Sequence, residues 1–134
     1  METEIFVDTS ALYALVSRKD VNYRIAGETW EKLIEQRMPL ITNNYVLVEC
    51  FSLLQNRLGL ESVVYIHSTI VPSLAISWIE EKQHEAAFSR FLSSDRRSLS
   101  LVDCSAFETM RRLDIKAVFT FDEHFREQGF SVIP

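Results

Sequence analysis

Short apolar runs alternate along the chain with longer stretches in which apolar residues recur every three or four positions. The short runs predict strands and the longer stretches predict amphipathic helices. Strands are expected at residues 5–7, 39–41, 74–78, 117–121 and, more briefly, 130–133. Helices are expected directly after the first strand and at residues 24–37, 44–58, 61–69, 80–92 and 103–113.

The predicted strands are mostly apolar runs, and helices separate them. This combination predicts an α/β fold in which a parallel sheet of four to five strands is covered by helices on both faces. No repeat, low-complexity tract or Pro/Gly-rich linker interrupts the pattern, so residues 1–134 are expected to form a single domain. In such sheets, ligands bind outside the carboxyl ends of the strands, where the strand order reverses.

Composition narrows the class of protein. Hydrophobic residues make up 47% of the chain and charged residues 25%, as in an average globular domain, so disorder is not expected. No apolar run approaches the ~20 residues of a membrane span. The first residues, Met-Glu-Thr-Glu, lack the basic start of a secretion signal. We therefore expect a cytoplasmic protein without membrane association.

Cysteine content and net charge exclude two further classes of site. Cys50 and Cys104 lie outside any C-x-x-C element, which argues against structural zinc. They could pair, but such thiols are more often buried as small apolar side chains. The formal charge of −5 argues against a broad basic surface for duplex DNA. It does not exclude nucleic acid, because acids gathered in a metal site would also make the charge negative.

Two aspartates stand where predicted strands end. Asp8 directly follows the first strand, and Asp122 follows the Val-Phe-Thr-Phe run of the fourth. Both therefore lie at the edge of the sheet where ligands bind. A helix also follows each of them, and aspartate is a favoured N-cap residue. The ligand interpretation and the capping interpretation both stay open for these two positions.

Asp103 stands at the start of the predicted helix at residues 103–113, so capping competes here as well. The segment Ser105-Ala106-Phe107-Glu108 fits the Ser-x-x-Glu capping box. If Ser105 caps this helix, Asp103 is free for another role. The pattern therefore favours a functional Asp103.

Glu49 lies inside a predicted helix that is apolar over most of its circumference. Its neighbours one helical turn away on the same face are Tyr45, Val46, Ser52 and Leu53. These residues do not form a charged, solvent-facing stripe. A partly buried carboxylate in this position requires a cation, a hydrogen-bond donor or a metal ion. A salt bridge with arginine or lysine would meet the same requirement.

The four acids together indicate a shared metal site more strongly than any one of them does alone. Several carboxylates converging at one edge of a sheet repel each other unless a cation lies between them. Oxygen ligands favour Mg²⁺ or Mn²⁺ over zinc. Such ions activate water and stabilise leaving oxygens in phosphoryl chemistry. The candidate catalytic and metal-binding residues are therefore Asp8, Glu49, Asp103 and Asp122.

Four segments resemble the motifs of PIN domains in order, spacing and context. They are Phe6-Val7-Asp8-Thr9-Ser10-Ala11-Leu12, Tyr45-Val46-Leu47-Val48-Glu49, Ser100-Leu101-Val102-Asp103-Cys104-Ser105-Ala106-Phe107, and Phe119-Thr120-Phe121-Asp122-Glu123-His124-Phe125 followed by Gly129-Phe130. The resemblance covers nearly the whole chain. Within the family, the chain looks like the VapC-type toxins of bacterial toxin–antitoxin pairs.

The resemblance implies a three-layer α/β/α sandwich and Mg²⁺- or Mn²⁺-dependent cleavage of RNA, either single-stranded or structured. It implies that the four acids hold one or two ions. Thr9, Ser10 and Ser105 are candidates to hydrogen-bond the ligating carboxylates. For a toxin, the resemblance also implies a cognate antitoxin protein and a homodimer.

Basic residues near the motifs are candidates for RNA contacts. Arg96 and Arg97 lie just ahead of the third motif, and Arg126 follows the fourth. Arginines of this kind bind phosphates at the rim of a nucleic-acid site. A solvated surface or local ion pairs would explain the same residues.

Other enzyme classes lack their motifs in this chain, since there is no glycine-rich nucleotide loop and no Gly-x-Ser-x-Gly element. Two alternatives keep the PIN resemblance but change the function. One is a solitary PIN nuclease in RNA processing. The other is a catalytically silent PIN fold that binds RNA or protein.

Overall fold

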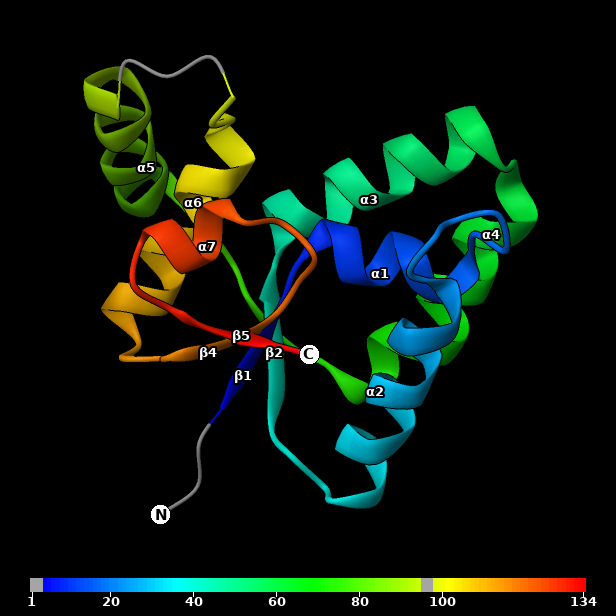
Figure 1. Ribbon diagram of the computed structural model, residues 1–134. Helices are drawn as coiled ribbons and strands as arrows, with labels where there is room; N and C mark the ends of the chain where they lie inside the picture. Colours follow the sequence, from blue (N-terminus) through cyan, green and yellow to red (C-terminus); the bar gives the residue numbers. More distant parts are fainter. Residues whose placement is uncertain (1–3, 95–97) are drawn as a thin grey trace.

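The computed structural model describes residues 4–94 and 98–134, which fold around one five-stranded parallel sheet (Figure 1). The strand order is β3-β2-β1-β4-β5, and every neighbouring pair is parallel. The prediction of a parallel α/β sheet is confirmed. The bounds are β1 (Ile5–Val7), β2 (Leu40–Asn43), β3 (Ala75–Ser77), β4 (Ala117–Phe119) and β5 (Ser131–Ile133).

Helices cover both faces of the sheet. Figure 1 shows α1, α2 and α4 on one side, and α5, α6 and α7 on the other, while α3 extends from the carboxyl end of β2. This arrangement is the predicted three-layer sandwich. The bounds are α1 (Thr9–Val16), α2 (Tyr23–Glu35), α3 (Asn44–Arg57), α4 (Leu60–Tyr65), α5 (Glu81–Ser94), α6 (Leu101–Arg112) and α7 (His124–Glu127). The turn that continues α4 is a π-helix, Ile66–Ile70, followed by a 3₁₀ turn, Val71–Ser73.

The order of the strands fixes where a ligand can bind. The chain runs from β1 outward to β2 and β3, then returns to the other side of β1 for β4 and β5. The strand order therefore reverses between β1 and β4, and the crevice at such a reversal is where α/β proteins bind ligands. Asp8 directly follows β1, so the fold places it at this crevice.

The central strands are apolar because they are buried on both faces. Ile5, Phe6 and Val7 are all buried, and Phe6 pairs with Ile41 on one side and with Val118 on the other. The edge strands β3 and β5 are more exposed. Cys50 and Cys104 are both buried and free, as expected.

Strand β4 is two residues shorter than predicted. Thr120 still donates its backbone N–H to the carbonyl of Ile133, but the N–H of Phe121 bonds to the hydroxyl of Ser10 instead of to a strand. The chain therefore leaves the sheet at this point and turns over the end of β1. Among the described residues, no helix is long and apolar enough to cross a membrane.

Candidate active site

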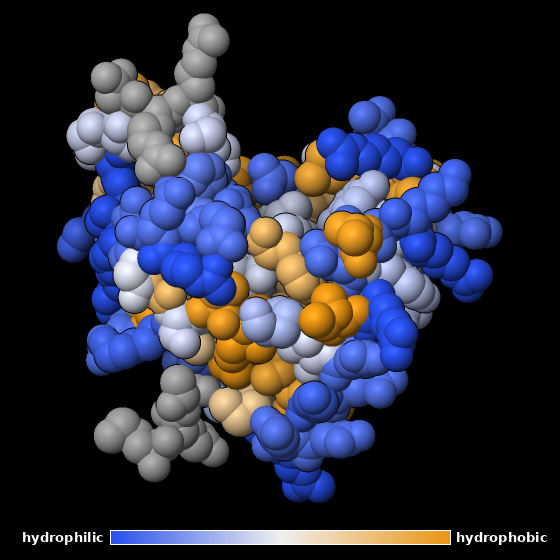
Figure 2. Space-filling model, in the orientation of Figure 1, coloured by the Kyte–Doolittle hydropathy of each residue, from blue (hydrophilic) through white to orange (hydrophobic). Residues whose placement is uncertain are grey.

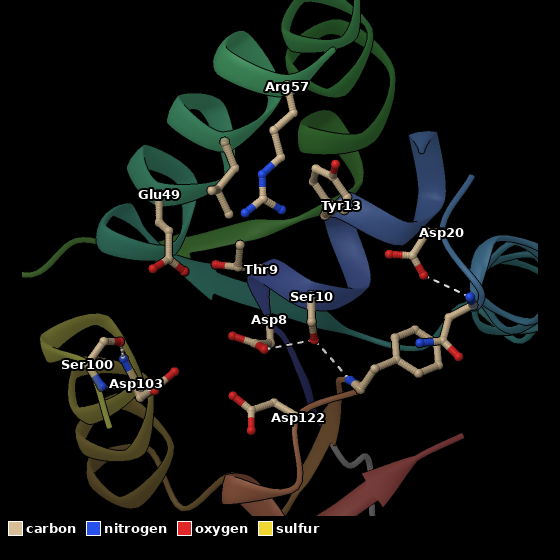
Figure 3. A pocket seen from close by; sticks show the side chains of 13 residues that line it. Asp8, Thr9, Ser10, Tyr13, Asp20, Glu49, Arg57, Ser100, Asp103 and Asp122 are labelled. Atoms are coloured by element: carbon tan, nitrogen blue, oxygen red, sulfur yellow. Dashed lines mark hydrogen bonds between the residues drawn. The ribbon is translucent and has the colours of Figure 1, made fainter. Parts of the chain in front are cut away.

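A pocket of about 380 Å³ opens above the carboxyl ends of the strands, and all four predicted acids line it. Figure 2 shows the surface hollowed between the helices α6 and α7 and the helix α3, with hydrophilic residues on both sides. Figure 3 shows carboxylates from separate elements around this hollow. The lining residues are Asp8, Thr9, Ser10, Tyr13, Asp20, Asn22, Glu49, Leu53, Arg57, Ser100, Asp103, Phe121 and Asp122.

Asp8 is the most buried acid of the pocket, with 4% of its surface exposed. It occupies the N-cap position of α1, yet its side chain makes no capping hydrogen bond. Its Oδ2 accepts hydrogen bonds from the hydroxyls of Thr120, at 2.8 Å, and Ser10, at 3.1 Å. The capping interpretation of this carboxylate is therefore wrong, and its side chain faces the pocket with two hydroxyls behind it.

Burial makes the charged form of Asp8 costly. The pKa of Asp8 is raised from 3.8 to about 6, mainly by desolvation and to a smaller extent by the negative charge of Asp103. The hydrogen bonds from Thr120 and Ser10 lower the pKa and offset part of this effect. A cation beside Asp8 would remove the cost, because it would favour the ionised carboxylate.

Hydroxyl groups connect β1 to the turn after β4. Besides donating to Asp8, the Thr120 hydroxyl accepts the backbone N–H of Asp122 at 3.0 Å. The Ser10 hydroxyl accepts the N–H of Phe121 at 2.9 Å and lies 3.0 Å from the Thr120 hydroxyl. This network holds the start of α1 against the turn that carries Asp122.

Asp103 lies in the first turn of α6, and Ser100 rather than Ser105 caps that helix. The Ser100 hydroxyl accepts the N–H of Asp103, and Oδ2 of Asp103 accepts the N–H of Ser100, both at 3.0 Å. The alternative in which Ser105 caps the helix and leaves Asp103 free is therefore wrong. The helix begins earlier than predicted, at Leu101, and Asp103 closes its capping box while lining the pocket.

The environment of Asp103 also disfavours its charged form. Burial raises the pKa of Asp103, and the negative charges of Asp122 and Glu49 raise it further. Its hydrogen bonds with Ser100 act in the opposite direction. Glu49 on α3 and Asp122 in the turn after β4 therefore both repel the charge of Asp103 on α6.

Glu49 is half-buried on α3, as its helix face predicted. In the described part of the chain, no arginine or lysine pairs with it, so the salt-bridge alternative finds no support there. Leu53 and Arg57 follow it at intervals of four residues and line the same pocket. One stripe of α3 therefore presents an acid, an apolar side chain and a cation to the site.

Asp122 contacts the start of α7 and also lines the pocket. Its Oδ1 accepts the N–H of His124 at 2.9 Å, which stabilises the start of the short helix α7. It also lines the pocket, as Figure 3 shows. The bond from His124 uses Oδ1, so the other carboxylate oxygen of Asp122 lies outside it.

Thr9 and Ser105 make different contacts from those we expected. The Thr9 hydroxyl is buried and has no hydrogen-bond partner within the described residues. The Ser105 hydroxyl donates to the carbonyl of Val102 at 2.7 Å and accepts a bond from Asn43 at 3.3 Å. Of the three candidate hydroxyls, Ser10 is thus the one that donates to a pocket carboxylate.

Of the three predicted RNA-binding arginines, the structure describes only Arg126, and Arg126 does not line the pocket. Arg126 is exposed and pairs with Glu123 one turn earlier. Arg96 and Arg97 lie outside the described residues. Their contacts with RNA stay predictions.

The PIN domain family model matches residues 5–131, which is almost the whole chain. The chain belongs to the PIN domain family. The 23S rRNA-specific endonuclease VapC20 of Mycobacterium tuberculosis is 30% identical over 128 residues, covering 94% of this chain and 95% of VapC20. The resemblance to PIN domains is therefore confirmed.

Solved structures agree with this assignment. The crystal structure of Mycobacterium tuberculosis VapC20, a toxin that cleaves the sarcin–ricin loop, matches with a TM-score of 0.83 and 29% identity. The match covers 94% of this chain and 95% of the VapC20 chain. FitAcB from Neisseria gonorrhoeae matches with a TM-score of 0.67 at 16% identity, over 97% and 96% of the two chains, and supports the fold alone.

The pocket of this PIN domain contains residues that our sequence interpretation missed. Asp20 is a fifth acid in the lining, and Tyr13 and Arg57 form the wall beside it. Arg57 could have been found, because it lies eight residues after Glu49 on the same helix stripe. Asp20 lies in the connection before α2, where no periodic pattern marks an inward side chain.

The donor set of this PIN domain fits a hard divalent cation. Within residues 4–94 and 98–134, no three acidic, histidine or cysteine side chains are already arranged as ligands of one ion. The pocket nevertheless offers carboxylates without histidine or cysteine, the set that Mg²⁺ and Mn²⁺ prefer. Among the residues that the structure describes, no cationic side chain pairs with the buried carboxylate of Asp8, and the buried hydroxyl of Thr9 has no hydrogen-bond partner. Both observations fit a site that a hydrated cation completes.

Proposed function

We propose that this PIN domain is a Mg²⁺- or Mn²⁺-dependent endoribonuclease. The observation that carries the proposal is the gathering of Asp8, Glu49, Asp103 and Asp122 around one pocket, at the reversal of strand order. The pKa values of Asp8 and Asp103 are raised by burial and by neighbouring negative charges, and such shifts are typical of functional sites. The 30% identity with an rRNA-specific endonuclease over nearly the full chain supports the same activity.

In this proposal, Asp8 and Asp103 are the main metal ligands, and Glu49 and Asp122 complete the set. A bound ion would supply a lowered pKa for an attacking water and stabilisation of the leaving oxygen. The hydroxyls of Thr120 and Ser10 both bond to Oδ2 of Asp8, so they fix the direction of this carboxylate. The capping box fixes Asp103 in the same way through Ser100.

The proposed substrate is RNA with an accessible single strand, such as a loop. A base-paired strand is harder to bring into a pocket of this size, whereas an unpaired strand can enter with its backbone toward the acids. VapC20 is named for cleavage of 23S rRNA and its sarcin–ricin loop. We therefore propose ribosomal RNA loops as the first substrates to try.

The test is endonucleolytic cleavage of ribosomal RNA and of a short single-stranded RNA by the purified chain. We expect cutting with Mg²⁺ or Mn²⁺, none with EDTA, and a loss of at least about a hundredfold in Asp8→Asn and Asp103→Asn. Glu31→Gln, which removes one exposed negative charge on α2, should keep full activity. A wild type that binds RNA but cuts none with either metal would instead be a silent PIN module.

We further propose that this nuclease is the toxin of a toxin–antitoxin pair. The resemblance to VapC-type proteins supports this role, and the acidic pocket suits an antitoxin segment that brings a basic side chain to the carboxylates. Expression should arrest growth, and Asp8→Asn should relieve the arrest. An adjacent small reading frame whose product also relieves it would identify the antitoxin. Unchanged growth would favour a solitary RNA-processing nuclease.

The homodimer stays a prediction, and measuring the molecular mass of the protein in solution would test it.

A further inference from the structure

Among the described residues that line the acidic pocket, Arg57 is the one cation. It stands in the last turn of α3, and Figure 3 shows its guanidinium directed toward the pocket beside Tyr13. The guanidinium carbon lies 5.5 Å from the centre of the Tyr13 ring. In the part of the chain that the structure describes, no acid pairs with Arg57. Its five donors are therefore open to a ligand that enters the pocket.

A second hollow continues from the acidic pocket and is basic. Its volume is about 510 Å³, and it shares Tyr13 and Arg57 with the acidic pocket. Its wall adds Arg18 and Lys19, and none of its described lining residues is acidic. Both added side chains are exposed, and neither pairs with an acid across the described ranges. Arg57, Arg18 and Lys19 thus form a group of cations, without an acidic partner among the described residues, that borders the carboxylates.

This arrangement of charge has a physical consequence for a chain with a net charge of −5. Three neighbouring cations repel each other and attract a polyanion, and each phosphate they bind releases condensed counterions from the nucleic acid. Guanidinium groups also bind phosphate oxygens through paired hydrogen bonds. An RNA strand whose reacting phosphate lies at the acids would therefore extend into the basic hollow.

We propose that Arg57, Arg18 and Lys19 bind the RNA backbone on the α1–α3 side of the acidic pocket. Arg57 positions the phosphate nearest to the reacting one, and Arg18 and Lys19 bind phosphates further along the strand. The inference rests on the proposed function, since it names how the RNA substrate of that site is held. It replaces Arg126, which pairs with Glu123, as the candidate contact among the described arginines.

A purely structural role for Arg57 makes a different prediction. A cation in the last turn of a helix stabilises the helix dipole, and the contact with Tyr13 adds to this stabilisation. Removing such a residue would lower the melting temperature without changing how RNA binding depends on salt. The salt dependence therefore separates the two roles.

The experiment measures binding of a fluorescent single-stranded RNA oligonucleotide between 50 and 200 mM KCl, a range chosen to resolve about one phosphate contact. The chain carries Asp8→Asn throughout, so that the RNA stays intact. Into this background are placed Arg57→Gln, Arg57→Lys, the pair Arg18→Gln with Lys19→Gln, and the control Lys116→Gln. Lys116 is exposed, pairs with Asp114 and precedes β4 at the opposite end of the strands, so it matches the charge removed.

We expect Arg57→Gln to reduce the slope of log K against log salt by about 0.7, and the double variant by about 1.4. Arg57→Lys should restore part of the slope, and Lys116→Gln should leave it unchanged. With Asp8 intact, Arg18→Gln with Lys19→Gln should raise KM severalfold and leave kcat within about twofold, because these contacts are equal in substrate and transition state.

The outcomes distinguish this inference from the nuclease itself. If the wild type cleaves RNA but all variants keep the salt dependence of Lys116→Gln, the proposed RNA contacts are wrong and the proposed nuclease activity is unaffected. If the wild type cleaves no RNA but the slopes fall as expected, the RNA contacts are supported and the nuclease activity is wrong. If the Asp8→Asn parent binds no RNA at all, the RNA contacts are also wrong.

Discussion

The hydroxyl of Thr120 donates a 2.8 Å hydrogen bond to Oδ2 of Asp8, although 112 positions separate the two residues. Thr120 is 1% exposed and Asp8 is 4% exposed, so the bond is shielded from water. It joins the end of β4 to the end of β1 and lowers the pKa of a carboxylate that burial raises. Thr120 therefore positions Asp8 and favours its ionised form.

Replacing Thr120 by valine should test this role. The variant keeps the shape of the side chain but removes the donor to Asp8 and the acceptor of the Asp122 N–H. We expect a loss of about 1–3 kcal/mol in the free energy of unfolding. We also expect the pKa of Asp8 to rise above about 6. At fixed, subsaturating Mg²⁺, the acid limb of the cleavage profile should then move to higher pH.

Thr42→Val is the matched control for this substitution. The Thr42 hydroxyl is equally buried and donates a 2.8 Å bond to the carbonyl of Val7, which is not an ionisable group. Its removal should lower stability by a similar amount and leave the pH profile in place. Equal pH profiles for both valine variants would show that Thr120 has no effect on the charge of Asp8.

Asp8→Asn should stabilise the metal-free protein at neutral pH. The folded pKa of Asp8, about 6, lies above the unfolded value of 3.8. The folded state therefore binds more protons between these values, and stability falls as pH rises from about 4 to above 6. The shift corresponds to a cost on the order of 3 kcal/mol, which asparagine avoids. Thermal unfolding should show a gain of several degrees at pH 7.5 and almost none at pH 4.

Glu31→Gln controls for the removal of one negative charge, since Glu31 is exposed on α2. Its melting temperature should stay within about one degree of the wild type at both pH values. A variant Asp8→Asn that is less stable than the wild type at pH 7.5 would mean that the carboxylate is compensated by a group within the chain. That outcome would remove the main reason to expect a cation beside it.

The capping box of α6 separates stability from activity. Ser100→Ala removes the acceptor of the Asp103 N–H and should cost about 1 kcal/mol. Asp103→Asn keeps an oxygen that can accept the Ser100 N–H, so stability should change little while metal-dependent cleavage is lost. Chemical denaturation and cleavage rates measure the two effects. Ser52→Ala on the exposed face of α3 is the control for hydroxyl removal.

Local patterns were sufficient to predict the sheet and the acids. Asp8 was found because an apolar strand and a helix meet at it, and Glu49 because its helix face has no solvated neighbours. These features depend on residues within one or two turns. They therefore leave a periodic signal in the sequence.

Features that depend on tertiary contacts could not be predicted in this way. Ser100 and Ser105 each stand three residues before an acid, and both fit a capping box. The choice between them depends on where α6 begins against the rest of the fold. The bond between Thr120 and Asp8 joins two strands that are adjacent only because the strand order reverses.

The most direct test of the central claim is to locate a divalent cation in the acidic pocket. Crystals of the wild type grown with Mn²⁺ should give an anomalous difference peak bound by Asp8 and Asp103. Crystals of Asp103→Asn grown in the same way should show a much weaker peak or none. A wild-type map without a peak in this pocket, at a Mn²⁺ concentration that supports RNA cleavage, would contradict the claim that these acids hold the catalytic metal.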